Sequence, residues 1–180
     1  MRDDHLTDLA LAASHGDDAA LAEFVTLTQG RVRSLCAHLG APCETDDLTQ
    51  ETYLRVVGAL HRFRGESSAE TWLLSIARHV CADHVRRRVR RTAIDRRQPR
   101  PDQFSPPEEL VEFGDVLGRL DDDQRTAFVL TQVLGCSYAE AAEVCDCPVG
   151  TIRSRVARAR QQLLAELADP GGAEPGDATG

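Results

Sequence analysis

The sequence predicts an all-α protein made of two small helical domains joined by a flexible linker, with a helix-turn-helix in the C-terminal domain. Ala, Leu, Arg and Glu, which favour helices, are abundant in the 180 residues, and β-branched or aromatic runs with strand spacing are absent. A proline-rich stretch separates two helical patterns. The predicted boundaries are 1–93 for the first domain, 94–107 for the linker, 108–168 for the second domain and 169–180 for a disordered tail.

The N-terminal part predicts two helices, over residues 5–15 and 17–39. Gly16 separates them, and Asp17 or Asp18 is suited to cap the start of the second. Apolar residues recur at helical spacing along the second helix and predict a face for packing. These residues are Leu21, Phe24, Val25, Leu27, Val32, Leu35 and Leu39.

Residues 46–91 predict a helical hairpin around which the rest of the chain is organised. The core-facing residues expected on its first helix are Leu48, Tyr53, Val56, Val57 and Leu60. The polar residues expected on its outer face are Asp46, Asp47, Gln50, Glu51 and Arg55. The second helix is predicted to start with a capping box of Ser67 and Glu70, to bury Trp72, Leu73, Ile76, Ala77 and Val80, and to end in an arginine run. An acidic face and a basic helix end in one hairpin indicate two macromolecular partners of opposite charge.

The C-terminal part has the pattern of a helix-turn-helix. A helix over 108–119 and a second over 120–135, closed by Gly135, precede a capping box of Ser137 and Glu140. A short helix over 137–144, a turn at 145–148 and a recognition helix from about residue 149 follow. The apolar face of the last helix is Ile152, Val156, Leu163, Leu164 and Leu167, and its opposite face begins with Arg153, Ser154, Ala157 and Arg158.

The distribution of charge favours nucleic acid although the formal net charge is −8. All 21 basic residues are arginine, and they cluster at 86–100 and 153–160. The guanidinium fork suits bidentate contacts to phosphate and guanine. A GC-rich genome explains the choice of arginine over lysine equally well, but it does not explain the clustering.

The composition argues against a membrane protein and against a metal or cofactor site. No apolar run approaches a membrane span and the N-terminus has no signal-peptide pattern, so a cytoplasmic, soluble protein is expected.

The six cysteines are expected to be reduced and mostly packed. Cys145 and Cys147 are too close together for the usual zinc knuckle, and Cys36 with His38 is only a weak hint of a metal site. We therefore expect no cofactor and no metal.

Two blocks of sequence resemble one known family. DDLTQETYLR and FRGESSAETWLLSIARH are similar to the second domain of extracytoplasmic-function (group IV) sigma factors of bacterial RNA polymerase, and PVGTIRSRVARAR is similar to their fourth domain. The absence of a third domain between the two blocks is typical of that class. Within the family, DDLTQET, TWLL and CDCPVGTIRSRVARAR together are most similar to the actinobacterial SigC-like group.

The resemblance implies a promoter-specificity subunit with three binding surfaces. The residues that match a surface for the β′ clamp helices of the polymerase core are Asp46, Asp47, Gln50, Glu51 and Arg55, and the second domain is expected to meet the β flap. Those that match a surface for single-stranded minus-10 DNA are His61, Phe63, Arg64, Ser67, Ser68, Thr71, Arg78, His79, Arg86 and Arg87. Those that match the readers of duplex minus-35 DNA are Thr151, Arg153, Ser154, Ala157 and Arg158.

Three positions depart from the family pattern. His79 stands where members often have Asn beside the melted minus-10 region, which puts the minus-10 preference in question. Asp146 occupies the helix-turn-helix turn where Gly is common, and Asp tolerates a left-handed backbone better than most residues. Ala157 replaces a residue that is frequently bulkier, so fewer minus-35 contacts are expected.

Two other functions fit parts of the sequence. A conventional helix-turn-helix regulator accounts for residues 108–168 but not for the acidic stripe of the hairpin. A metal-dependent enzyme using Asp46, Asp47, Glu51 and His61 lacks an ExxH or HExxH pairing. We therefore predict a protein without catalytic activity of its own.

The free protein is also expected to be held inactive. Either an anti-sigma factor or intramolecular masking would do this, the latter by acidic residues 121–123 or 108–115 covering the arginine-rich end of the first domain.

Overall fold

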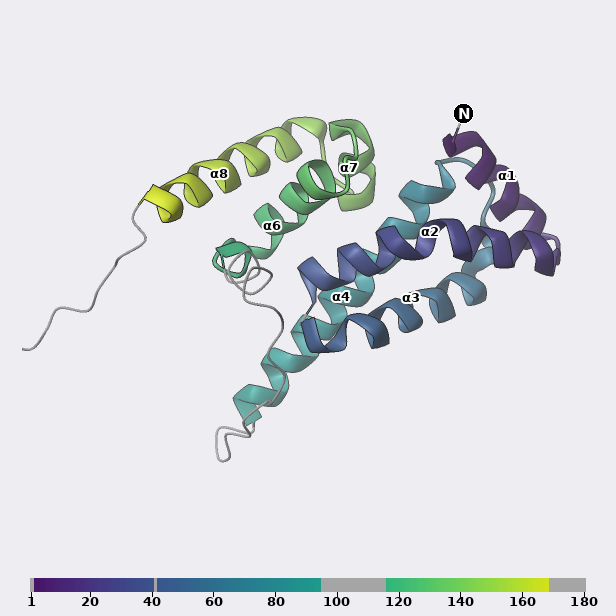
Figure 1. Cartoon of the computed structure of the whole chain (residues 1–180), viewed down its shortest axis with the longest axis horizontal. Helices are drawn as coiled ribbons and strands as arrows, with labels where there is room; N and C mark the ends of the chain where they lie inside the picture. Colours follow the sequence, from purple (N-terminus) through teal and green to yellow (C-terminus); the bar gives the residue numbers. More distant parts are fainter. Residues whose placement is uncertain (1, 41, 95–115, 169–180) are drawn as a thin grey trace, which may run out of the picture.

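The computed structural model describes residues 2–40, 42–94 and 116–168, and all regular structure in these ranges is helical (Figure 1). This confirms the predicted all-α class. The linker segment 95–107, the start of the helix expected at 108–119 and the tail 169–180 lie outside the described residues. Within the described ranges, no helix combines the length and apolar character that a membrane crossing requires.

Four helices form the first part of the molecule. They are α1 (Arg2–Ser14), α2 (Asp18–Leu39), α3 (Thr45–Ala59) and α4 (Ala69–Ile94), with 3-10 turns η1 (Pro42–Glu44) and η2 (Leu60–Arg62) on either side of α3. Asp17 caps α2 as predicted, because its carboxylate accepts the Ala20 N–H at 3.0 Å. Helix α2 packs against α1, α3 and α4, and its buried Phe24, Val32 and Leu35 fill the space between them.

The start of α4 differs from the prediction by one residue. The cap is Ser68, whose hydroxyl accepts the Thr71 N–H at 3.1 Å, and not Ser67 with Glu70. The N–H of Ala69, a fully buried residue, donates to the hydroxyl oxygen of Thr7 on α1 at 3.1 Å. This tertiary contact fixes the register of the helix start, and it moves Glu70 out of the position from which a capping box forms.

Three residues that were predicted to face the core are exposed, namely Leu27, Val57 and Leu164. The buried faces of α2, α3 and α8 are therefore narrower than the apolar pattern of the sequence indicated. Val57 and Leu164 each follow a buried residue, Val56 and Leu163, and one step along a helix turns the side chain by about 100°. The buried side of α3 consists of Thr45, Leu48, Thr52 and Val56, so half of that stripe is threonine.

The second part of the molecule contains the predicted helix-turn-helix. Helix α6 (Asp122–Phe128) continues into a π-helical turn, η3 (Val129–Val133), and is followed by α7 (Tyr138–Cys145) and α8 (Val149–Ala168). Ser137 and Glu140 form the predicted capping box. Asp146 ends α7 with φ 51°, in the left-handed conformation that the sequence required there.

The two parts are packed against each other. Helix α7 lies on α4, and α6 with η3 approaches α2. The buried apolar residues of both parts form one continuous cluster. Figure 1 shows α6, α7 and α8 together on one side of the α2–α4 layer, with α3 on the other side.

The capping box of α7 gives a test of this fold. Replacing Ser137 by Ala removes a hydroxyl that accepts the Glu140 N–H, so the free energy of unfolding should fall by about 1 kcal/mol. Urea titration followed by circular dichroism measures this. Ser154→Ala is the control, because Ser154 lies inside α8 and its hydroxyl bonds only back to the Thr151 carbonyl; this variant should not be destabilised. Equal loss in both variants would show that Ser137 does not act as a cap.

Candidate functional site

The outer face of α3 presents the predicted acidic stripe. Asp46, Asp47 and Gln50 are exposed, and Glu51 is partly buried. Asp46 forms an ion pair with Arg33 of α2. The stripe is therefore present as a surface, with one of its carboxylates already paired across to the neighbouring helix.

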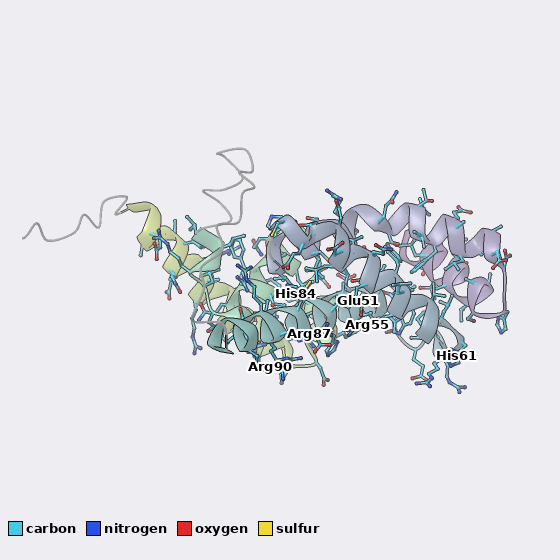
Figure 2. The ribbon with its side chains drawn as sticks, turned by 90° about the horizontal axis from the view of Figure 1, so that it is seen from below. Glu51, Arg55, His61, His84, Arg87 and Arg90 are labelled. Carbon is cyan, nitrogen blue, oxygen red and sulfur yellow. The ribbon has the colours of Figure 1, made fainter. Side chains whose placement is uncertain are left out.

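Arg55 has a different environment from the rest of the stripe. Its Nε donates to Glu51 at 2.9 Å, and one terminal nitrogen donates to Asp83 of α4 at 3.0 Å. Asp83 also accepts from Arg86 at 2.7 Å, and these two guanidinium groups, Arg86 foremost, lower the pKa of Asp83 to about 2. Figure 2 shows Glu51 and Arg55 on α3 beside α4, which carries Arg87 and Arg90 further along. Arg55 thus connects α3 to α4 and is only partly available to another protein.

The loop predicted to hold minus-10 bases has the ring of Phe63 in the core, and its polar side chains range from exposed to buried. Phe63 is only 7% exposed and its ring centroid lies 4.9 Å from that of Trp72. His61 and Arg64 are exposed, Ser67 and Ser68 are partly buried, and Thr71 is buried with its hydroxyl bonded to Ser68. In this conformation Phe63 packs against Trp72 and offers little surface for a base to stack on.

Four residues of α4 were predicted to bind minus-10 DNA. Arg78 is covered by α7, and His79, Arg86 and Arg87 are exposed. The Nε of Arg78 donates to the Val144 carbonyl of α7 at 2.9 Å, so this side chain lies under the second part of the molecule. His79 is exposed, with its Nδ1 bonded to the Ser75 carbonyl at 2.7 Å. Arg86 and Arg87 are exposed further along α4, and Figure 2 shows Arg87 at that end of the helix.

Helix α8 separates its arginines into two kinds. Arg153 and Arg158 are exposed together with Ser154 and Ala157, and Thr151 is partly buried at the start of the helix. Arg155 pairs with Asp123 and reaches the sulfur of Cys147, and Arg160 donates to Gln132 at 2.6 Å. The predicted readers therefore share one open face, while the arginines between and after them are tied to neighbouring helices.

A cleft lies where the two parts meet. It has a volume of about 500 Å³ and is lined by Asp4, Thr7, Asp8, Gly65, Glu66, Ser67, Ser68, Thr71, Glu140 and Glu143. The polar loop before α4 thus faces two glutamates of α7 across this space. The contributions of α1 and α7 to this site were not predicted, because the masking expected from the sequence involved residues 108–115 or 121–123 and the arginine-rich end of the first domain.

A second contact between the parts was also missed. Arg31 of α2 pairs with Glu70 of α4, and another of its nitrogens lies 3.6 Å from the sulfur of Cys136, just before α7. An arginine in the middle of an amphipathic helix has the sequence signature of a solvated residue. Only the packed structure shows that it bridges three segments.

Residues 121–123 were predicted as one possible cover for the arginine-rich end of α4, but in the structure they have other partners. Asp121 caps α6, Asp122 pairs with Arg125, and Asp123 pairs with Arg155. These carboxylates are engaged within the second part itself, because the start of α6 and the side of α8 offer closer partners. The alternative segment 108–115 lies outside the described residues.

Comparison with known proteins identifies the family. Residues 24–91 match the family described as Sigma-70 region 2, and residues 110–163 match Sigma-70, region 4. The ECF RNA polymerase sigma factor SigC of Mycobacterium tuberculosis is 50% identical over 185 residues, which cover 99% of this chain and 96% of that protein. This chain belongs to the extracytoplasmic-function sigma factors. It is therefore a promoter-recognising sigma factor of bacterial RNA polymerase, as its two sequence blocks predicted.

More distant relatives and solved structures agree with this assignment. The ECF RNA polymerase sigma-E factor of Escherichia coli is 32% identical, over 89% of the sigma factor described here and 94% of the relative. The structure of CnrH in complex with the cytosolic domain of CnrY has a TM-score of 0.76 at 27% identity, covering 93% of this chain and 99% of that chain. The sigma factor RpoE in complex with the anti-sigma factor NepR from Bartonella quintana has a TM-score of 0.71 at 28% identity, with coverage of 82% and 96%.

The cysteines of the sigma factor do not gather into a metal-binding cluster in the described part of the chain, where no group of three or more His, Cys, Asp or Glu side chains is suitably placed. Cys36 faces Cys81 with 3.8 Å between the sulfurs, whereas the ring of His38 bonds the Ser34 carbonyl. Burial raises the pKa of Cys145 to about 11, which keeps this thiol protonated at neutral pH. The weak hint of a Cys36 and His38 site therefore has no geometric support.

The Arg55, Asp83 and Arg86 cluster predicts a pH dependence of stability. In the fold Asp83 has a pKa of about 2, below the value of about 4 in an unfolded chain. Its ionised form therefore stabilises the fold above about pH 4, and this contribution is lost as the pH falls from about 4 through 2. Because the Asp83 side chain is 35% exposed, Asp83→Asn should cost less than about 1 kcal/mol at pH 7.

Urea unfolding of the wild type and of Asp83→Asn from pH 7 down to about pH 2 measures this difference. It should shrink toward zero at the acidic end. A difference that stays constant with pH would mean that the two arginines do not stabilise the ionised carboxylate.

Proposed function

We propose that the sigma factor divides its work between three surfaces. The outer face of α3 binds the β′ clamp helices of the polymerase core, and the second part of the molecule meets the β flap. The loop 61–71 with α4 holds single-stranded minus-10 DNA, and the open face of α8 reads the duplex at minus-35. It acts in the cytoplasm as a specificity subunit, without catalytic activity of its own.

The observation that carries this proposal is the separation of the arginines on α8. Arg153 and Arg158 are exposed beside Ser154 near the start of a helix that follows a capped α7, while Arg155 and Arg160 are paired to other helices. Recognition helices place base-contacting residues at this position in the major groove.

The minus-10 surface is proposed from the polar loop and the cationic side of α4. Single-stranded nucleic acid is held by base-sized sites above a basic track for the backbone. His61 and Arg64 lie exposed in the loop, and Arg86 and Arg87 lie exposed toward the other end of α4. His79 lies between them and supports the same surface.

We further infer that the packed arrangement is a closed state. Arg78 is bonded to a carbonyl of α7, and Glu140 and Glu143 face the loop across the cleft. Negative charge opposite the loop opposes the entry of a phosphate backbone. Opening requires α7 to leave α4, which polymerase or promoter DNA would drive by binding the open form more tightly. Alternatively, an anti-sigma factor would hold the two parts together in the closed state.

Transcription in vitro tests the proposed function. The protein and purified polymerase core should together initiate at a promoter from the protein's own genome, and core alone should not.

On templates that vary each minus-35 position, Arg153→Ala should lose about 1 to 3 kcal/mol of discrimination at one base pair. Arg160→Ala is the control, because Arg160 is tied to Gln132 and should not change base preference. A uniform loss over all templates would place Arg153 on the phosphate backbone instead.

The closed state is tested through Arg31. Arg31→Ala removes the bridge between Glu70 and the Cys136 segment, so the intact protein should bind a minus-10 single strand more tightly than the wild type does. Arg33→Ala is the matched control on the same helix, because Arg33 pairs only outward with Asp46 and should leave this affinity unchanged. Fluorescence anisotropy with a labelled oligonucleotide measures both. Unchanged affinity in Arg31→Ala would argue that the packed arrangement does not restrict the loop.

A further inference from the structure

Two thiols from different helices meet in the core of the first part of the molecule. Cys36 lies in the last turn of α2, and Cys81 lies in the middle of α4, which packs beside α2 (Figure 1). The Cys81 thiol donates to the Cys36 sulfur at 3.8 Å, and the two residues are only 1% and 0% exposed. Because the sulfurs of a disulfide are about 2 Å apart, a further approach of less than about 2 Å would join them.

The contact makes the two thiols unequal. The hydrogen bond from Cys81 lowers the pKa of Cys36, although burial acts in the opposite direction. The same hydrogen bond and burial raise the pKa of Cys81, and the positive charge of Arg125 on α6 offsets this only in part. The thiolate, and not the neutral thiol, is the nucleophile in cysteine chemistry. Cys36 is therefore the sulfur that reacts first with an oxidant, and Cys81 is the thiol that lies in place to react with it next.

The position of Cys36 near a helix end gives a small reagent access to the pair. Helix α2 ends at Leu39, and the Cys36 carbonyl accepts the N–H of the capping residue Gly40 at 2.8 Å. Helix ends open locally more often than helix centres do. Opening of this last turn would expose Cys36 to a molecule as small as hydrogen peroxide while the rest of α2 stays packed.

We propose that Cys36 and Cys81 are a redox-sensitive pair, which hydrogen peroxide converts into an intramolecular disulfide that links α2 to α4. The Cys36 thiolate attacks one oxygen of the peroxide, the O–O bond breaks, and the released hydroxide takes up a proton and leaves as water. Cys81 then attacks the sulfur of the Cys36 sulfenic acid. The S–S bond forms, the S–O bond breaks, and the hydroxide leaves with the Cys81 proton as a second water. Two electrons pass from the thiols to the peroxide, and a dithiol reductant reverses the change.

The disulfide would enclose a large part of the first domain in a covalent loop. Residues 37–80 include the whole of α3 and the loop 61–71, which carry two of the surfaces in the proposed function. The chemistry of the two thiols does not depend on that function. A disulfide restricts the unfolded chain, so the oxidised protein should have a higher thermal unfolding midpoint than the reduced protein. Disulfides of proteins in a reducing compartment are usually transient and often sense oxidants, which is the role inferred here.

Peptide mapping of the full-length protein tests the proposal. Cys43 is exposed and shares the tryptic peptide 34–55 with Cys36, so the experiment uses the Cys43→Ser variant. The variant is treated with hydrogen peroxide, digested with trypsin without reductant and analysed by mass spectrometry. Peptide 34–55 should be found joined to peptide 79–86, which contains Cys81, and the free form of both peptides should be largely lost. Dithiothreitol should restore the two separate peptides.

Two further substitutions in the Cys43→Ser protein provide a matched comparison. Cys81→Ala and Cys136→Ala each remove one buried thiol, but the sulfur of Cys136 lies beside Arg31 at 3.6 Å. The linked peptides should still form in Cys136→Ala and should be absent in Cys81→Ala. Without its partner thiol, Cys36 should accumulate as the sulfenic acid in Cys81→Ala, which a dimedone probe detects.

The outcome in the Cys43→Ser protein decides the proposal even where an alanine variant does not fold. Linked peptides from protein that circular dichroism shows to be folded, together with a thermal midpoint that falls when dithiothreitol is added, would support it. If peroxide leaves both peptides unlinked, or links them only after the protein has unfolded, the pair is not a disulfide-forming site. If the oxidised protein has a lower thermal midpoint than the reduced protein, the fold does not accommodate the bond, and the two thiols are ordinary core residues.

Discussion

The packing of α2 against its neighbours is the constraint on which the rest of the structure depends. Its buried side, with Phe24, Val32 and Leu35, is shared by α1, α3 and α4, and α6 approaches the same helix. Burial of apolar surface is the main favourable term in folding, so these contacts hold both halves of the helical hairpin in place. The acidic face of α3 and the basic end of α4 can be displayed together only because a third helix supports both from within.

The pairing of charges then decides which side chains are left for partners. Arg55, Arg155 and Arg160 each have a partner on another helix, whereas Arg153 and Arg158 are exposed in the first half of α8. The protein is acidic overall, and its carboxylates are used repeatedly to fix arginines in position. An acidic chain thereby holds several of its described arginines in ion pairs and leaves Arg153 and Arg158 as a small basic surface.

Local rules predicted the helices, and tertiary contacts explain where they failed. The capping box of Ser137, the left-handed Asp146 and the exposed face of α8 depend on residues within one turn of each other, so the sequence alone indicates them. The start of α4 was predicted one residue too early because Thr7, far away in the sequence, accepts the Ala69 N–H. The cleft and the Arg31 bridge were missed for the same reason, since packing between the two parts leaves no periodic signal.

The contact between Thr7 and Ala69 also connects the N-terminal helix to the loop that we propose holds minus-10 bases. Helix α1 bears none of the residues assigned to DNA, yet its threonine sets where α4 begins, and its side chains form one wall beside the loop. In two relatives that have identical loops but different first helices, α4 would then begin at different positions, and the loops would be placed differently relative to α4. Promoter preference in such proteins would differ because of α1, without any change in a residue of the loop itself.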